Sequence, residues 1–131
     1  MTKWLAELRA RAQVGGPTLL LCIADDDPIL AETRRLLIEL LRVTPLPVVD
    51  LGESAPDAGP RRWAELTRRQ PGAVYVLTAA PTSPLSLRPM VTLYNTEREL
   101  LRELDGPLLL VVSRATERAI RETSPDFITW A

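Results

Sequence analysis

Short, uninterrupted apolar runs alternate with amphipathic segments along this chain. The apolar runs cover residues 18–24, 46–51, 73–79 and 107–112. Apolar residues recur at helical spacing within residues 2–13, 27–42, 60–70, 90–104 and 115–123. Strands that alternate with helices favour a mostly parallel sheet with helices on its faces. The sequence therefore predicts a single α/β domain over residues 1–131, a three-layer sandwich of about four mostly parallel strands flanked by helices.

Apolar patterning and Pro residues also predict where individual elements lie. The run 18–24 has no polar alternation, which is typical of a strand covered on both faces. Pro45 and Pro47 beside the second run favour an edge position, because Pro cannot donate to a strand ladder. Residues 81–89 are expected to be irregular, and residues 125–130 extended or turn-like. The inward stripe of the helix 27–42 is expected to hold Leu30, Leu36, Leu37, Leu40 and Leu41.

Missing residue types exclude several chemistries. The chain has no His, and Lys3 is its only Lys among 16 basic residues. Without imidazole there is no Ser-His or Cys-His pair and no His metal ligand. A lone Lys at position 3 cannot serve a phosphate-binding loop farther along the chain. A net charge of −1 gives no electrostatic reason to expect nucleic acid. We therefore expect no enzyme activity and no cofactor.

The N-terminal residues and the single Cys indicate a compartment. Charges interrupt the first eleven residues, unlike the apolar core of a signal peptide. The apolar runs are far shorter than the roughly 20 residues that a membrane span needs. Cys22 has no second Cys to pair with and is expected to be a small buried hydrophobe. These features predict a cytoplasmic protein without membrane contact.

Three consecutive carboxylates follow the first apolar run, at Asp25, Asp26 and Asp27. Ligands of such sheets bind at the carboxyl ends of strands. The position resembles the start of response-regulator receivers, in which acidic residues there hold Mg²⁺. However, no acidic residue lies between Glu65 and Glu97 to accept a phosphoryl group. We expect Asp27 to cap the next helix and its neighbours to solvate a loop. The alternative is a receiver-like or divalent-metal-dependent domain that uses Asp25, Asp26 and Asp27.

A more distinctive pattern begins near the start of the C-terminal third. It reads Asn95-x-x-Arg98-Glu99-x-Leu101, then an apolar strand that begins at Pro107, then Pro125-Asp126-Phe127-x-x-Trp130. This resembles a segment of bacterial multidomain proteins of the STAND NTPase and tetratricopeptide-repeat type, and the α/β layout resembles their inactive, degenerate P-loop-like modules. The resemblance implies a non-hydrolysing adaptor or regulatory domain of bacterial conflict and signalling systems. Its partner would be a STAND NTPase, a repeat protein or an effector.

The same residues have a structural interpretation beside the functional one. Asn95 and Arg98 lie one helical turn apart, and Arg98 could bond a carboxylate such as Asp25 or Asp126. Phe127 and Trp130 could pack the end of the chain onto the sheet, or could bind a partner. The candidate interface residues are Asn95, Arg98, Glu99, Asp126, Phe127 and Trp130. The sequence favours a protein-interaction module that docks to a partner protein or to a second copy of itself.

Overall fold

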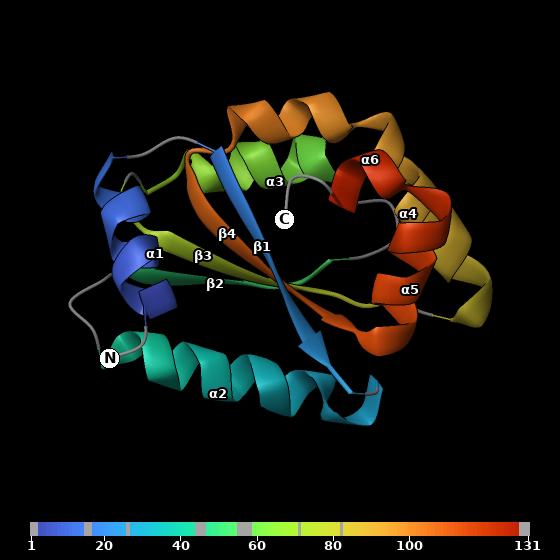
Figure 1. Ribbon diagram of the computed structural model, residues 1–131, viewed down its shortest axis with the longest axis horizontal. Helices are drawn as coiled ribbons and strands as arrows, with labels where there is room; N and C mark the ends of the chain where they lie inside the picture. Colours follow the sequence, from blue (N-terminus) through green and yellow to red (C-terminus); the bar gives the residue numbers. More distant parts are fainter. Residues whose placement is uncertain are drawn as a thin grey trace.

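A four-stranded, all-parallel sheet lies between two layers of helices (Figure 1). The computed structural model describes residues 3–14, 17–25, 27–43, 47–54, 59–70, 72–81 and 83–128. The strands are β1 (Pro17–Ala24), β2 (Val48–Ser54), β3 (Val74–Ala79) and β4 (Gly106–Ser113), in the order β1-β4-β3-β2. The α-helices are α1 (Lys3–Val14), α2 (Leu30–Arg42), α3 (Pro60–Thr67), α4 (Leu87–Thr96), α5 (Arg114–Thr123) and α6 (Pro125–Ile128). The predicted three-layer α/β fold is confirmed.

The path of the chain explains the two helical layers. From β1 the chain crosses one face of the sheet through α2 and reaches β2 at the opposite edge. It returns one strand at a time, to β3 and then β4, with α3 and α4 on the other face. Parallel crossovers are right-handed, so a reversal of direction moves the connecting helices to the opposite face. Helices α1 and α2 therefore share one layer, and the remaining α-helices form the other (Figure 1).

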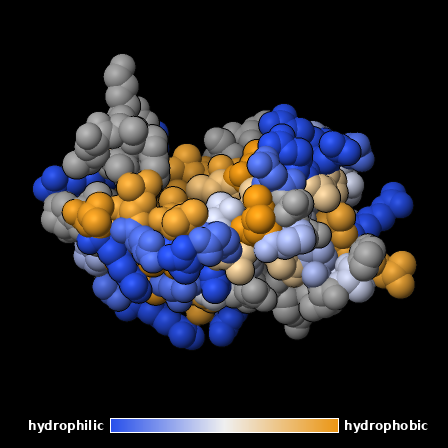
Figure 2. All heavy atoms as spheres, turned by 90° about the horizontal axis from the view of Figure 1, so that it is seen from below, coloured by the Kyte–Doolittle hydropathy of each residue, from blue (hydrophilic) through white to orange (hydrophobic). Residues whose placement is uncertain are grey.

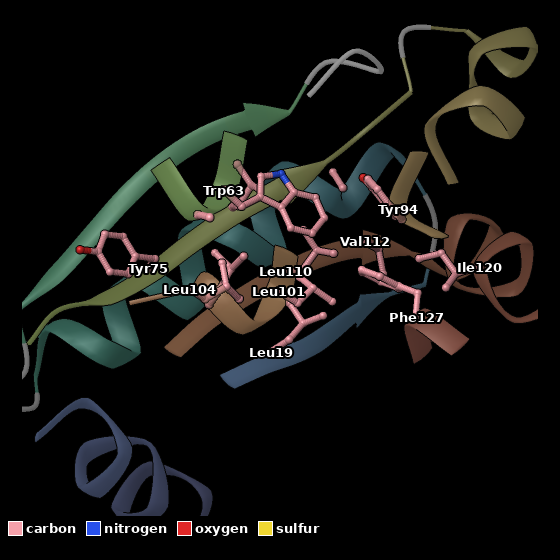
Figure 3. Packing of buried hydrophobic residues seen from close by; sticks show 14 of the residues in the cluster. Leu19, Trp63, Tyr75, Tyr94, Leu101, Leu104, Leu110, Val112, Ile120 and Phe127 are labelled. Atoms are coloured by element: carbon pink, nitrogen blue, oxygen red, sulfur yellow. The ribbon is translucent and has the colours of Figure 1, made fainter. Parts of the chain in front are cut away.

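Each face of the sheet has its own core, as the two-residue period of a strand requires. On β4, Leu109 and Val111 pack against α1 and α2. Leu108 and Leu110 point to the opposite face, where aromatic rings fill the larger core (Figure 3). Strands β3 and β4 are buried along their whole length, as central strands are.

The sequence predicted one of the two strands that lie at the edges of the sheet. Strand β2 lies at an edge, as the neighbouring Pro residues predicted. The prediction that residues 18–24 form a strand covered on both faces is confirmed, because Leu19 packs into one core and Ala24 into the other. That β1 is the other edge strand was not predicted. An apolar run shows that a strand is rich in hydrophobic side chains, but the pairing of other strands determines whether it has one neighbour or two.

Two segments that follow β3 differ from the expectation. Residues 81–89 were predicted to be irregular, yet a 3₁₀ turn (η2, Pro84–Ser86) leads into α4. Ser83 and Ser86 bond each other's backbone as a reciprocal cap, which starts the turn. The single helix predicted over 90–104 is instead α4 followed by a 3₁₀ segment (η3, Arg98–Glu103). Side chains three apart eclipse in 3₁₀ winding, so Leu101 and the following Leu104 both reach the core.

The start of α2 and the end of the chain also differ. A 3₁₀ turn (η1, Asp27–Ile29) precedes α2, and Ile29 occupies its N-cap position without a side-chain hydrogen bond. Asp27 is therefore part of the turn, not the cap of the α-helix. The expected extended or turn segment after Thr123 includes the short helix α6, which begins at a Pro as helical first turns often do.

Candidate functional site

The carboxyl ends of β1 and β4 are where the chain diverges to opposite faces of the sheet. The two strands are hydrogen-bonded neighbours, with Ala24 opposite Ser113. After β1 the chain turns to α2, whereas after β4 it turns to α5 on the other side. Open α/β sheets bind ligands where the connections after two neighbouring strands leave for opposite faces. The carboxyl ends of β1 and β4 are therefore the candidate binding site.

The polar groups at this reversal bond one another. Arg114 Nη2 donates to Asp25 Oδ1 at 2.9 Å, and both side chains are more than half exposed. Ser113 Oγ accepts from the backbone N–H of Thr116 at 3.2 Å and donates to the Thr116 hydroxyl at 3.1 Å. The suggested bond from Arg98 to Asp25 is absent, because Arg114 lies closer along the sheet edge and pairs with it. Ser113 thus caps the amino end of α5, and Arg114 and Asp25 form an ion pair on the surface.

Only part of the predicted acidic cluster falls within the described residues. Asp25 is an exposed carboxylate at the end of β1, whereas Asp26 and the side chain of Asp27 lie outside the described part of the chain. Among the described residues, no group of three or more His, Cys, Asp or Glu side chains is placed to hold a metal ion. Asp25 is the one of these three carboxylates whose side chain the structure describes, and it is already bonded to the guanidinium of Arg114.

Asn95, Arg98 and Glu99 lie at the junction of α4 and η3. Arg98 Nη1 donates to the Asn95 backbone oxygen at 2.9 Å and reaches its Oδ1 at 3.4 Å. The one-turn spacing does bring these two side chains together, but among the described residues the guanidinium binds its own helix end and no carboxylate. Glu99 is exposed and lies 3.6 Å from the Arg102 guanidinium. These groups stabilise the end of α4.

Phe127 lies in the core, not on the surface. It is fully buried, its ring stacks on Tyr94 with centroids 5.1 Å apart, and it meets Trp63 edge-on at 6.2 Å (Figure 3). A side chain with no exposed surface cannot contact a partner in this conformation, so the structural interpretation fits Phe127. The side chain of Asp126 and all of Trp130 lie outside the described residues.

An exposed apolar stripe on α2 was not predicted. Leu36 and Leu40 were expected on the inward face, yet they are 52% and 43% exposed, and Val43 is 82% exposed. The buried residues of the helix are Leu30, Ile38 and Leu41. Apolar positions span more than half of the helix circumference, which is wider than one sheet face can cover. The wide spread of apolar positions around this helix can be read from the sequence, and it is the signal that could have predicted the exposed stripe.

Burial raises the pKa of three described side chains, Cys22, Tyr75 and Tyr94. Burial raises the pKa of the Cys22 thiol to about 11, so it stays protonated and weakly nucleophilic at neutral pH. Burial also raises the pKa of Tyr94, whose hydroxyl has no hydrogen-bond partner among the described residues. The Tyr75 hydroxyl donates to the Thr67 carbonyl at 2.6 Å, and burial raises its pKa as well. None of these groups is poised to exchange a proton near neutrality.

No protein-family model matches this chain, and no curated protein or solved structure shows significant similarity to it. In the part of the chain that the structure describes, no helix is both long and apolar enough to cross a bilayer. The function must accordingly be argued from the surfaces of the molecule itself.

Proposed function

We propose that this chain is a cytoplasmic, non-catalytic protein-interaction module, acting as an adaptor or regulatory domain in a bacterial signalling or defence system. The observation that carries the proposal is the exposed stripe on α2, here called the α2 apolar surface and defined as Ile29, Leu36, Leu40 and Val43. Figure 2, which views the molecule from the α2 side, shows hydrophobic side chains gathered next to hydrophilic ones.

The spacing of these four residues makes them one continuous surface. Steps of seven, four and three residues place them on the same side of a helix. Each is at least 40% exposed, so water contacts the whole stripe in the monomer. Large aliphatic side chains that stay exposed in a row mark sites where another molecule binds.

A charged row borders the α2 apolar surface. Arg35 Nη1 donates to Glu39 Oε1 at 2.6 Å, and its other guanidinium nitrogens bond Glu32. The hydrogen bond from Arg35 holds the pKa of Glu32 below its usual range, so Glu32 is ionised at neutral pH. An apolar stripe with a polar rim has the anatomy of a protein interface.

A helix of a partner protein is the occupant that fits this surface. The stripe runs the length of α2, and a second amphipathic helix could lie along it with apolar residues at matching intervals. The resemblance of the C-terminal third favours a STAND NTPase, a repeat protein or an effector as the partner. Helical-repeat proteins present such helices on a concave face.

A photo-crosslinking residue placed at Leu40 tests this function in the cells that express the protein. Ala31 is the matched control position, because it is exposed on the opposite side of the same helix. We expect one protein to be crosslinked from Leu40 and not from Ala31. That protein, once purified, should bind the wild-type chain in calorimetry, and L36E should weaken the binding at least about tenfold.

Two results would reject the proposal. Equal crosslinking from both positions would mean that the α2 apolar surface has no specific partner. An unchanged affinity in L36E would mean that the partner binds elsewhere on the chain.

Divalent-cation binding is the second candidate, because Asp25 is an exposed carboxylate at the sheet reversal. A bound cation would stabilise the folded state, so Mg²⁺ or Ca²⁺ would raise the melting temperature and D25N would abolish the rise. The interaction proposal expects no shift in either protein.

A further inference from the structure

Strand β1 forms an edge of the sheet that no described element pairs. It hydrogen-bonds β4 on one side, and none of the other described strands pairs with its second side. Figure 1 views the sheet from this edge, with β1 in front of the other strands and no helix drawn across it. No described helix or strand therefore covers the second side of β1.

The opposite edge carries the features that prevent strands from pairing between molecules. In β2 the register shifts between Asp50 and Gly52, and Gly52 has a φ of +79°. Asp50 is exposed and accepts a hydrogen bond from the backbone of Gly52 at 2.9 Å. Pro47 directly precedes the strand. An irregular register, a charge and a nearby Pro are the devices with which proteins protect an edge.

Strand β1 has almost none of these devices. Its eight residues run in unbroken register against β4, contain no charged side chain, and include Pro only at the first position. Ile23 is 42% exposed, and the side chains of Leu20 and Leu21 are half-buried. A long, regular, apolar edge of this kind is a template for pairing with another strand.

We propose that the β1 edge pairs antiparallel with β1 of a second copy of this chain, so that two sheets join into one of eight strands. A two-fold axis perpendicular to the sheet generates this arrangement and closes it as a dimer. Such an axis keeps each face of the sheet on its own side. With Leu21 on the axis, Ile23 lies opposite Leu19 of the second copy and loses its exposure to water.

The charges at the two ends of β1 select the antiparallel orientation. Arg11 is exposed beside the amino end, where its Nη1 reaches Thr18 Oγ1 at 3.4 Å. Asp25, 78% exposed, follows the carboxyl end. The two ends are about 23 Å apart in one copy, at roughly 3.3 Å per residue. Antiparallel pairing places each Arg11 near Asp25 of the other copy, whose carboxylate also bonds Arg114 of its own chain, whereas parallel pairing would place the two Arg11 side chains together.

This interface is separate from the surface assigned to a partner protein. The α2 apolar surface lies over one face of the sheet, and the β1 edge lies at its side. Substitutions can therefore test the two independently, and failure of one proposal leaves the other intact.

Sedimentation equilibrium of the full chain tests the proposal, with I23K as the disrupting variant and L40K as its matched control. Both replace an aliphatic side chain of nearly equal exposure, 42% and 43%, by Lys. We expect the wild type and L40K to sediment at twice the chain mass of 14.6 kDa, and I23K at the chain mass. Circular dichroism melts show whether each variant is folded.

A second pair of variants serves if I23K does not fold. R11E reverses the charge at the amino end of β1, and R9E makes the same change at an exposed position of the same helix. We expect R11E to weaken the dimer about tenfold and R9E to leave it unchanged. A wild type that stays at the chain mass at about 100 μM would overturn the proposal. So would disruption by L40K with I23K still dimeric, or equal effects of R11E and R9E.

Discussion

At the scale of single residues, three aromatic rings tie the larger helical layer together. Trp63 comes from α3, Tyr94 from α4 and Phe127 from α6, and their centroids are 4.9 to 6.2 Å apart. All three are fully buried against the sheet (Figure 3). Edge-on and stacked rings at these distances stabilise a core beyond the area they bury. Phe127 thus packs α6 against α3 and α4.

Truncating this ring should destabilise the fold. We expect F127A to lower the free energy of unfolding by about 3–5 kcal/mol, because it removes a buried ring and leaves a cavity. Urea denaturation measures the change. F127L keeps most of the volume and should cost less than about 1.5 kcal/mol. Equal, small losses in both variants would contradict the packing seen for Phe127.

Cys22 should make stability depend on pH in the alkaline range. Burial raises the pKa of its thiol from 9.0 to about 11, so the folded state keeps its proton when the unfolded chain has lost it. This contribution is fully present below pH 9 and is lost as the pH rises towards 11. The free energy of unfolding of the wild type should therefore fall more steeply than that of C22A over this range. Both proteins contain the same Tyr residues, whose contributions cancel, and parallel curves would refute the shift.

At the scale of elements, the sequence indicates well which segments become strands and helices. It indicates less well where each element lies in the sheet and which of its side chains are covered. Unbroken apolar runs predicted all four strands, since burial and β-propensity act locally on each run. The edge position of β1 was missed because strand order depends on the crossover that carries α2 past two other strands. The exposed Leu36 and Leu40 were missed because helical periodicity identifies an apolar side of a helix, while the contacts made by the sheet determine how much of it is covered.

The candidate site was predictable only in its general position. Asp25 does lie at the carboxyl end of a strand, as the α/β pattern suggested, but its guanidinium partner is Arg114 and not Arg98. The pairing of Arg98 depends on the end of α4 at Thr96, which a prediction of one helix over 90–104 could not reveal. The α5 cap at Ser113 was also missed, although a Ser just before a helix is a recognisable signal.

The contribution of the Ser113 cap to the free energy of unfolding should be measurable. Ser113 Oγ accepts the backbone N–H of Thr116 at 3.2 Å in a buried position. We expect S113A to lower the free energy of unfolding by about 1 kcal/mol, because the N–H group loses its acceptor. S113T retains a hydroxyl and should recover most of the loss in the same urea titration. An S113A protein as stable as the wild type would show that α5 does not depend on this cap.

At the scale of the whole molecule, the two proposed interfaces reinforce each other. The two-fold axis of the β1 dimer leaves both α2 apolar surfaces on the same side of the joined sheet. A dimer could then engage two helices of one repeat protein, and the second contact would form at a high effective concentration. Self-association would in this way strengthen binding of a partner without any additional contact.

Dimer formation should also make thermal stability depend on concentration. We expect the melting temperature of the wild type to rise by about 5 °C for a hundredfold increase in protein concentration, because mass action favours the folded dimer. I23K should melt at the same temperature at both concentrations. Scanning calorimetry or circular dichroism measures the change, and a wild type insensitive to concentration would contradict the dimer.

Amide hydrogen exchange at low and high protein concentration tests most directly that two copies of this molecule pair through the β1 edge. The backbone of residues 17–24 should exchange more slowly at high concentration, because β1 gains a second hydrogen-bonded neighbour. Residues 48–54, on the protected edge, should exchange at the same rate at both concentrations. Exchange of residues 17–24 that does not change with concentration, or slowing confined to residues 48–54, would contradict the account.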